Sequence, residues 1–270
     1  MPKKQKPHVV IWCSDLHAGS RWAVCPPEVT IDLGGEEPSL YQANAIQTAL
    51  YGDWQDFIGK CKDRAKGKRP ILILGGDLSD GAHHHGSHET FGSPDDQKAI
   101  AVELLLPLAT MADEIYGLRG TRGHVGELAQ ADMDICKELG AVSTYNFLNL
   151  EVDGKLVNAR HHFYCSRKPA TRGNSHRTLG MDEAMECMIR EERKPDVILR
   201  GHVHLAYREY LAVHDMWIAS SGGWQLGTYF TSGLGREVQD IGGMIYLPSE
   251  HKIELINYKG KLANNNFDLS

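Results

Sequence analysis

The stretch Val9-Val10-Ile11-Trp12-Cys13-Ser14-Asp15-Leu16-His17 is a short apolar run that stops abruptly in an Asp-x-His pair. The apolar part predicts a buried strand. Side chains two residues apart on a strand point the same way, so the carboxylate of Asp15 and the imidazole of His17 would share one face at its end. Both groups can bind a metal ion, but a site needs further ligands from other parts of the chain.

The composition is that of an ordinary globular protein, with 270 residues of which 41% are hydrophobic and 24% are charged. This length suits one large domain. We expect a single domain over 1–270, in which a loop and a helix at about 18–66 form an insertion. The net charge of −6 argues against a protein that coats nucleic acid by charge alone, although it is compatible with a nuclease that carries a local basic patch.

The sequence contains no apolar run approaching the roughly 18 residues of a membrane-spanning helix, so we expect no membrane partner. The apolar run that follows the basic N-terminus, Val9 to Cys13, is too short for the core of a signal peptide. The six cysteines include no C-x-x-C pair and are expected to be reduced. Together these features predict a cytoplasmic protein.

Strand-like and helix-like segments alternate at first, and strand-like segments dominate later in the chain. The unalternated apolar run Ile71-Leu72-Ile73-Leu74 predicts a strand buried on both faces, hence a largely parallel sheet covered by helices. Ser39 is the expected N-cap of a helix over about 40–64, and a basic loop is expected over 167–177. The other expected helices span about 95–112, 127–139 and 181–193, and the other expected strands span 114–118, 145–152, 155–161, 196–199, 206–213, 216–221, 243–247 and 253–258. This order predicts an α/β architecture with two sheets, at least one of them partly parallel, and helices on the outside.

Five of the strand-like runs end in a turn that carries a metal ligand or a candidate for one. The carboxyl ends of strands in α/β sheets are where ligands usually bind, so these turns are expected to meet. Mixed carboxylate and imidazole ligands suit Mn²⁺, Fe, Zn²⁺ or Ni²⁺. The five turns carry Asp15 and His17; Asp77; Thr121 and His124; His161 and His162; and His202 and His204.

The order of these turns resembles that of the calcineurin-like metallophosphoesterases. The resemblance extends from Val9 to about His204 and rests on D-x-H, G-D-x-x-D and G-H-x-H, each of which follows an apolar run. It implies a four-layer αββα sandwich, in which two mixed β-sheets are flanked by helices and a dinuclear metal centre lies at the C-terminal ends of the strands. The matching blocks are Asp15-Leu16-His17, Gly76-Asp77-Leu78-Ser79-Asp80, Gly120 to His124, His161-His162 and Gly201-His202-Val203-His204.

The resemblance also implies a ligand set for two divalent ions. Of these ions we expect Mn²⁺ first, with Fe, Zn²⁺, Ni²⁺ or Mg²⁺ as alternatives. Two ions roughly 3.5–4 Å apart lower the pKa of a shared water and hold the attacking and leaving oxygens of a displacement at phosphorus. By position in the blocks, Asp15, His17 and His204 would hold the first ion, Asp77 would bridge both ions, and His161 and His202 would hold the second.

One block departs from the family pattern, which usually reads Gly-Asn-His-Asp or Gly-Asn-His-Glu. There Asn binds the second metal, and His contacts the phosphate and assists the leaving group. Here the block reads Gly120-Thr121-Arg122-Gly123-His124. Thr121 is therefore a candidate ligand of the second ion through its hydroxyl, unless a water or another residue completes that site. His124 remains the candidate general acid or phosphate contact, and Arg122 is a candidate phosphate-binding residue. A weaker second metal site is the expected consequence.

Two further assignments stay open at this level. Adjacent residues in a strand face opposite ways, so only one of His161 and His162 should point at the metals, and the family pattern favours His161. Asp80 is expected to orient the loop or a ligand histidine, as the outer carboxylates around metal sites do.

The sequence thus predicts a metallophosphoesterase in which a metal-bridging hydroxide attacks phosphorus, with Asp77 and His124 as catalytic residues. We expect a phosphodiester substrate, with nucleic acid or a nucleotide as the candidate partner. The alternatives are a phosphomonoesterase or protein phosphatase of the same superfamily and a non-catalytic metal-binding scaffold. The scaffold is an alternative because Thr121 stands where the family pattern has the metal-binding Asn.

Overall fold

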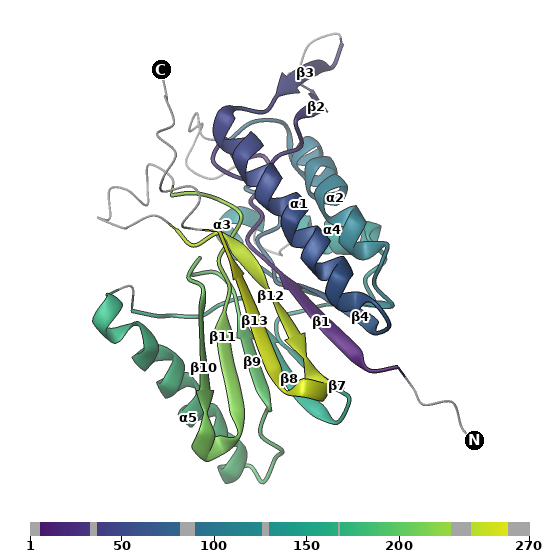
Figure 1. Cartoon of the computed structure of the whole chain (residues 1–270). Helices are drawn as coiled ribbons and strands as arrows, with labels where there is room; N and C mark the ends of the chain where they lie inside the picture. The colour runs from purple at the N-terminus through teal and green to yellow at the C-terminus, as the bar shows by residue number, and fades with distance from the viewer. Residues whose placement is uncertain are drawn as a thin grey trace, which may run out of the picture.

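Two β-sheets pack face to face, and helices cover their outer faces (Figure 1). The computed structural model describes residues 6–32, 37–81, 90–125, 130–166, 168–227 and 239–258. The six-stranded sheet has the order β13-β12-β1-β4-β5-β6, with strands Lys252–Asn257, Gly242–Leu247, His8–Cys13, Arg69–Leu74, Glu114–Leu118 and Thr144–Tyr145. The five-stranded sheet has the order β10-β11-β9-β8-β7, with strands Tyr207–Leu211, Met216–Ser220, Val197–Arg200, Lys155–Arg160 and Leu148–Val152.

Both sheets are mixed. In the first, β1, β4, β5 and β6 run parallel to one another, whereas β12 is antiparallel to both of its neighbours, β1 and β13. In the second, β8, β9 and β11 are parallel, and the outer strands β7 and β10 are antiparallel to their neighbours. The parallel strands of each sheet therefore end at the same edge, where ligands of α/β proteins usually bind.

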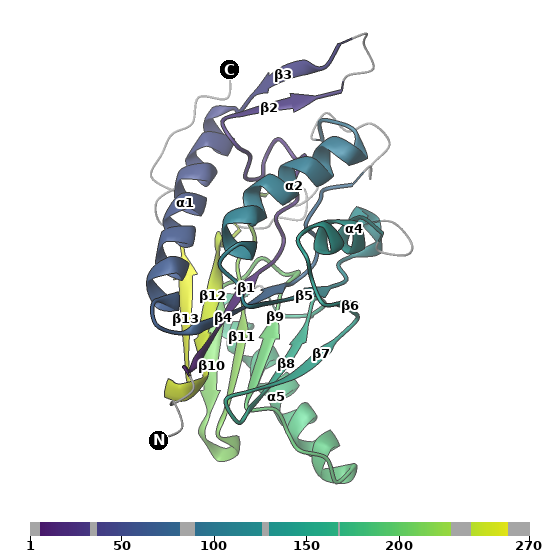
Figure 2. The ribbon, with the colours of Figure 1, turned by 90° about the vertical axis from the view of Figure 1, so that its right-hand side faces the viewer.

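Helices cover the two sheets unequally. Figure 2 shows α1, α2 and α4 on the outer side of the first sheet and α5 on the outer side of the second. The helices are α1 (Ala45–Ala65), α2 (Pro94–Ala109), α3 (Arg122–Val125), α4 (Gln130–Glu138) and α5 (Arg172–Ile189), with short 3₁₀ turns at Pro169–Thr171, Ala212–His214 and Pro248–Glu250. None of the helices in the described ranges is long and apolar enough to cross a bilayer.

Alternation along β1 shows how the layers are built. Val9, Ile11 and Cys13 belong to the core under α1, α2 and α4. Val10 and Trp12 belong to the core between the two sheets. A strand that is apolar at every position is thus buried on both faces, and the predicted αββα sandwich is confirmed.

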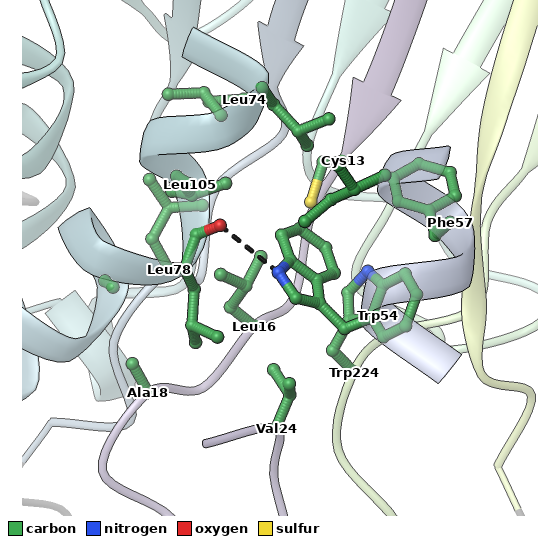
Figure 3. Packing of buried hydrophobic residues seen from close by; sticks show 14 of the residues in the cluster. Cys13, Leu16, Ala18, Val24, Trp54, Phe57, Leu74, Leu78, Leu105 and Trp224 are labelled. Atoms are coloured by element: carbon green, nitrogen blue, oxygen red, sulfur yellow. Dashed lines mark hydrogen bonds between the residues drawn. The ribbon is translucent and has the colours of Figure 1, made fainter. Parts of the chain in front are cut away.

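The core beneath the helices also holds the turn after β1 in place. Leu16 and Ala18 are fully buried there, beside Trp54 and Trp224 (Figure 3). The indole N–H of Trp54 donates to the backbone carbonyl of Leu104, at 3.2 Å. Because Leu16 and Ala18 anchor the turn in the core, His17 between them and Asp15 before them are fixed in position at the end of β1.

The predicted start of the first helix was wrong. Ser39–Gln42 form strand β3, which pairs with β2 (Glu28–Ile31) in a small hairpin. The helix begins at Ala45, and its N-cap is Asn44, whose side chain accepts the N–H of Gln47 while the Gln47 side chain accepts the N–H of Asn44. This reciprocal cap fixes the helix start several residues later than Ser39 would have done.

The predicted boundaries of the fifth helix were also wrong. It begins at Arg172 instead of near 181, so much of the expected basic loop is helical. Glycines at 173 and 180 weaken the helical signal in the sequence. A Cβ at Gly180 would lie 2.1 Å from Ile218 Cδ1, so this glycine allows the helix to pack closely on the sheet. The start of the helix expected over 127–139 lies partly outside the described residues.

We predict that Trp54→Ala lowers the free energy of unfolding by about 3–5 kcal/mol, because it leaves a cavity in this core. Urea denaturation followed by circular dichroism measures the loss. Leu106→Ala is the matched control, since Leu106 is 53% exposed on a neighbouring helix and should change stability by less than about 0.5 kcal/mol. Equal losses in the two variants would show that the Trp54 core does not stabilise the fold as described.

Candidate metal centre

Five of the seven predicted ligands share an unusual backbone conformation. Nine non-glycine residues in the described ranges have positive φ, and five of them are Asp15, His17, Asp77, His202 and His204, with φ between 48° and 69°. Side chains disfavour this left-handed region, and such conformations persist mainly where the surrounding structure imposes them for function. The five meet where the adjacent edges of the two sheets come together, and this clustering indicates a functional site.

The first cluster consists of Asp15, His17 and His204. All three are buried, and each offers one ligand atom within 4.8 Å of the others. Nε2 of His204 lies 3.2 Å from Nε2 of His17 and 3.3 Å from Oδ1 of Asp15. The backbone N–H of His202 donates to both carboxylate oxygens of Asp15, at 3.1 Å each. This bond ties the end of β9 in one sheet to the end of β1 in the other.

The second cluster surrounds the carboxylate of Asp77. Its Oδ2 lies 3.0 Å from Nε2 of His161 and accepts the Thr121 hydroxyl at 2.9 Å. The same hydroxyl lies 3.1 Å from Nδ1 of His202. Thr121 therefore contacts all three of the other predicted ligands of the second ion, since it also lies 3.3 Å from His161.

The orientation of His161 suits a metal ligand. Its Nδ1 lies 2.7 Å from the backbone carbonyl oxygen of Gly75, and Nδ1–H can donate to that oxygen. In the neutral ring this bond leaves the lone pair on Nε2, which faces Asp77 and is the atom free to bind a metal ion. Fixing the tautomer through the second ring nitrogen is the usual way that proteins orient a metal-binding histidine.

His162 does not turn away as expected. Strand β8 ends at Arg160, so the alternation of a strand no longer applies to the two histidines that follow. The ring of exposed His162 lies 5.0 Å from that of His161 and 5.1 Å from that of His202. The three imidazoles form one group, in which only His161 contacts Asp77.

The turn after β5 places His124 beside the first cluster but leaves Arg122 outside both clusters. The His124 ring lies 4.5 Å from that of His17, and its Nδ1 lies 3.0 Å from the carbonyl oxygen of Asp80. Arg122 begins α3 with an exposed side chain, and the hydrogen bonds of the two clusters among the described residues do not involve it. A Cβ at Gly120 would lie 2.1 Å from Oδ1 of Asp77, so the turn can approach the carboxylate only with glycine there.

The buried carboxylates and imidazoles of the site shift one another's pKa values. Burial by itself would raise the pKa of Asp77, but the charge and hydrogen bond of His161 hold it well below its usual range. Burial would lower the pKa of His161, whereas the charge and hydrogen bond of Asp77 raise it to about 10. Burial and then the charge of His161 lower the pKa of His202 to about 4. A proton thus sits between Asp77 and His161 where a metal ion would displace it.

The donor atoms fit metal ions. In the first cluster a carboxylate oxygen and two imidazole nitrogens converge, and their lone pairs repel unless a proton or a cation lies between them. Burial removes the water that would otherwise screen this repulsion. Carboxylate and imidazole donors in this proportion suit Mn²⁺, Fe or Zn²⁺. The residues present therefore fit one ion at the first cluster, and the atoms around Asp77 fit a second.

The carboxylate of Asp80 lies beside the imidazole of His17. Its Oδ1 lies 3.4 Å from Nδ1 of His17 and accepts a hydrogen bond from Gln225 at 3.2 Å. Its Oδ2 accepts the hydroxyl of Thr90 at 2.8 Å. The geometry supports the role expected for Asp80 from the G-D-x-x-D block.

Asp132 contacts the backbone of the candidate site, and the sequence does not predict it. It is fully buried in α4. Its Oδ2 accepts the backbone N–H groups of Asp77 at 3.2 Å and Gly120 at 2.8 Å, and its Oδ1 accepts that of Leu78 at 3.0 Å. Burial and then the charge of Asp77 raise the pKa of Asp132 to about 7. The only signal in the sequence is a carboxylate on the buried face of a helix, which no metal motif marks.

Comparisons with known proteins find structural likeness only. No family model matches the sequence, and no curated protein matches it. A solved structure of an archaeal phosphodiesterase has 12% identity and a TM-score of 0.46, and the match covers 93% of this chain and 99% of that one. The protein TT1561 of Thermus thermophilus has 10% identity and a TM-score of 0.45, with 94% and 99% covered. Vps29 of Entamoeba histolytica, solved with Zn²⁺, has 11% identity and a TM-score of 0.41, with 93% and 98% covered. These likenesses concern the backbone, so the activity has to be argued from the side chains.

We predict that Asp132→Asn weakens Mn²⁺ binding by about 10- to 100-fold, the usual cost of losing an outer partner of a metal site. The variant has one oxygen for three N–H donors, and its NH₂ group faces a backbone N–H. Isothermal titration calorimetry measures the affinity. Asp134→Asn on the same helix is the matched control and should bind as the original chain does. Unchanged binding in Asp132→Asn would contradict the positioning role.

Proposed function

We propose that this chain is a metal-dependent phosphoester hydrolase with two divalent ions. The observation that carries the proposal is the place of Asp77, whose carboxylate lies close to the ligand atoms of Asp15 and His161 in one group and of His17 and His124 in another. A carboxylate has two oxygens and a negative charge, so it can serve two ions at once. Such a pair of sites is typical of enzymes that displace groups at phosphorus.

Each cluster would hold one ion. Bound ions would supply Lewis-acid chemistry, which lowers the pKa of water and neutralises negative charge at phosphorus. The protein supplies the ligands, the dry environment and the fixed orientation of the imidazoles. The first ion would take Asp15, His17, His204 and Asp77, and the second would take Asp77, Thr121, His161 and His202.

We assign the proton transfer to His124. With Nδ1–H donating to the carbonyl oxygen of Asp80, Nε2 is the nitrogen that can exchange a proton with the leaving oxygen. His124 is partly exposed, as a residue that meets substrate must be. Its ring packs edge-on against that of His17, which holds it beside the first cluster.

Several finer features belong to the same proposal. The mixed oxygen and nitrogen ligands suit Mn²⁺, Fe or Zn²⁺, and of these we propose Mn²⁺. We propose a phosphodiester as the substrate class. The six cysteines are all free thiols, which suits the reducing cytoplasm. We also propose that the whole chain acts as one domain.

A second candidate is a metal-binding scaffold without catalysis, which the replacement of Asn by Thr121 favours. A hydroxyl is a weaker neutral ligand than an amide oxygen, so the second ion would bind more weakly. The two candidates differ in turnover. A phosphomonoesterase differs from both in its preference between mono- and diester substrates.

We predict that the Mn²⁺-loaded chain hydrolyses bis-p-nitrophenyl phosphate faster than p-nitrophenyl phosphate, and that Asp77→Asn lowers this turnover by at least about 100-fold. The loss should exceed that for an outer partner, because Asp77 is a direct ligand. Initial rates of p-nitrophenol release measure it. Asp63→Asn, an exposed carboxylate on α1, is the control and should retain the full rate.

Absence of turnover with Mn²⁺, Fe²⁺, Zn²⁺, Ni²⁺ and Mg²⁺ would overturn the hydrolase in favour of the scaffold. Faster hydrolysis of the monoester would overturn the diester preference alone.

A further inference from the structure

A cavity of about 590 Å³ lies beside the second cluster. It opens between the carboxyl ends of β8 and β9 and the first half of α5. This volume is within the range of small-molecule sites, roughly 300–1,000 Å³. The lining residues that matter here are Arg160, His162, Tyr164, Asn174, Thr178 and Asp182, and Arg200 lies at one side.

His162 connects the cavity to the candidate metal centre. It lines the cavity, and its ring lies 5.0 Å from that of His161 and 5.1 Å from that of His202. A phosphoester held at the second cluster would therefore have this cavity next to it, on the far side of His162.

The strand wall of the cavity is rigid and carries two arginines. Arg160 and Arg200 are register partners in the parallel pair of β8 and β9. The residues before them, Ala159 and Leu199, face the other sheet, so both arginines face α5. Arg200 is only 2% exposed, and it is fixed by the carbonyl oxygen of Leu199 at 3.0 Å and the carboxylate of Glu183 at 3.6 Å.

The helix wall presents hydrogen-bonding groups. Asn174, Thr178 and Asp182 follow one another at four-residue steps and therefore share a face of α5. They offer an amide, a hydroxyl and a carboxylate, so the wall both donates and accepts hydrogen bonds. The rim carries Tyr164, whose side chain is 91% exposed and so presents a bare aromatic ring to solvent.

The charges around the cavity balance. Two cations, Arg160 and Arg200, face two anions, Asp182 and Glu183. A site for a second phosphate would carry an excess of positive charge. A cavity whose charges balance, with both polar and apolar lining groups and an aromatic rim, suits a neutral ring that has hydrogen-bonding edges, and a nucleobase is such a ring.

We propose that this cavity binds the nucleoside part of the substrate, which makes the substrate a nucleotide phosphodiester; this rests on the proposed function. The base stacks on Tyr164, and its edge meets Asn174, Thr178 and Asp182. Any base can stack on an exposed aromatic ring. The cavity is therefore expected to bind a nucleoside without strong preference for one base.

The test compares three ligands on the Mn²⁺-loaded full chain by isothermal titration calorimetry: adenosine 5′-monophosphate, ribose 5-phosphate and inorganic phosphate. The monophosphate should bind at least about tenfold more tightly than ribose 5-phosphate, because only it carries a base to stack. Tyr164→Ala should remove most of that difference and leave the affinity for inorganic phosphate unchanged. Tyr210→Ala, a partly exposed tyrosine at the edge of the second sheet, is the matched control and should bind all three as the original chain does.

Equal affinity for the monophosphate and ribose 5-phosphate would overturn the nucleoside site, as would a Tyr164→Ala variant that retains the full difference. Asn174→Ala, a second exposed position, checks the result with a substitution on the opposite wall. The proposed hydrolase fails separately. Base-dependent binding without turnover of any phosphoester would leave the nucleoside site standing and overturn hydrolysis.

Discussion

The structure of the site depends on how Asp77 is held. Its backbone is left-handed, with φ of 51°. The carboxylate of Asp132 accepts the backbone N–H of Asp77. The carboxylate of Asp77 in turn accepts the N–H and the hydroxyl of Thr121, at 2.5 and 2.9 Å. The buried carboxylate of Asp132 therefore positions that of Asp77. Its hydrogen bonds also join the turn after β4 to the turn after β5. Without Asp132, three backbone N–H groups would be buried without an acceptor, which costs more than the bonds contribute.

Neither sheet forms the site alone. The first sheet contributes Asp15, His17 and Asp77 from the ends of β1 and β4, and the second contributes histidines from the ends of β8 and β9. The core between the sheets aligns these edges, and the bond from the His202 N–H to Asp15 joins them. Packing of apolar faces thus determines a polar constellation in which no two of the blocks are close in sequence.

The sequence was sufficient for the parts of the fold that follow from local pattern. Apolar runs that end in Asp or His predicted the strands and the edge where Asp15, Asp77 and His204 meet. Asp132 was not predictable, because its role depends on three backbone groups brought together by tertiary structure. The position of His162 depended on where β8 ends, and the start of α5 on glycines that weaken the helical signal yet permit close packing. The boundaries and the contacts of Asp132 therefore needed the structure, whereas the turns that carry the candidate ligands could be predicted from the sequence.

The most direct test of this account is the anomalous scattering of crystals of the full chain grown with Mn²⁺. The account predicts two peaks: one among Asp15, His17 and His204, and a weaker one that touches Thr121, His161 and His202, with Asp77 bound to both ions. The lower occupancy would reflect the hydroxyl of Thr121 in place of an amide ligand. A single peak held by His161, His162 and His202 without Asp77, or no peak at this edge, would contradict the account.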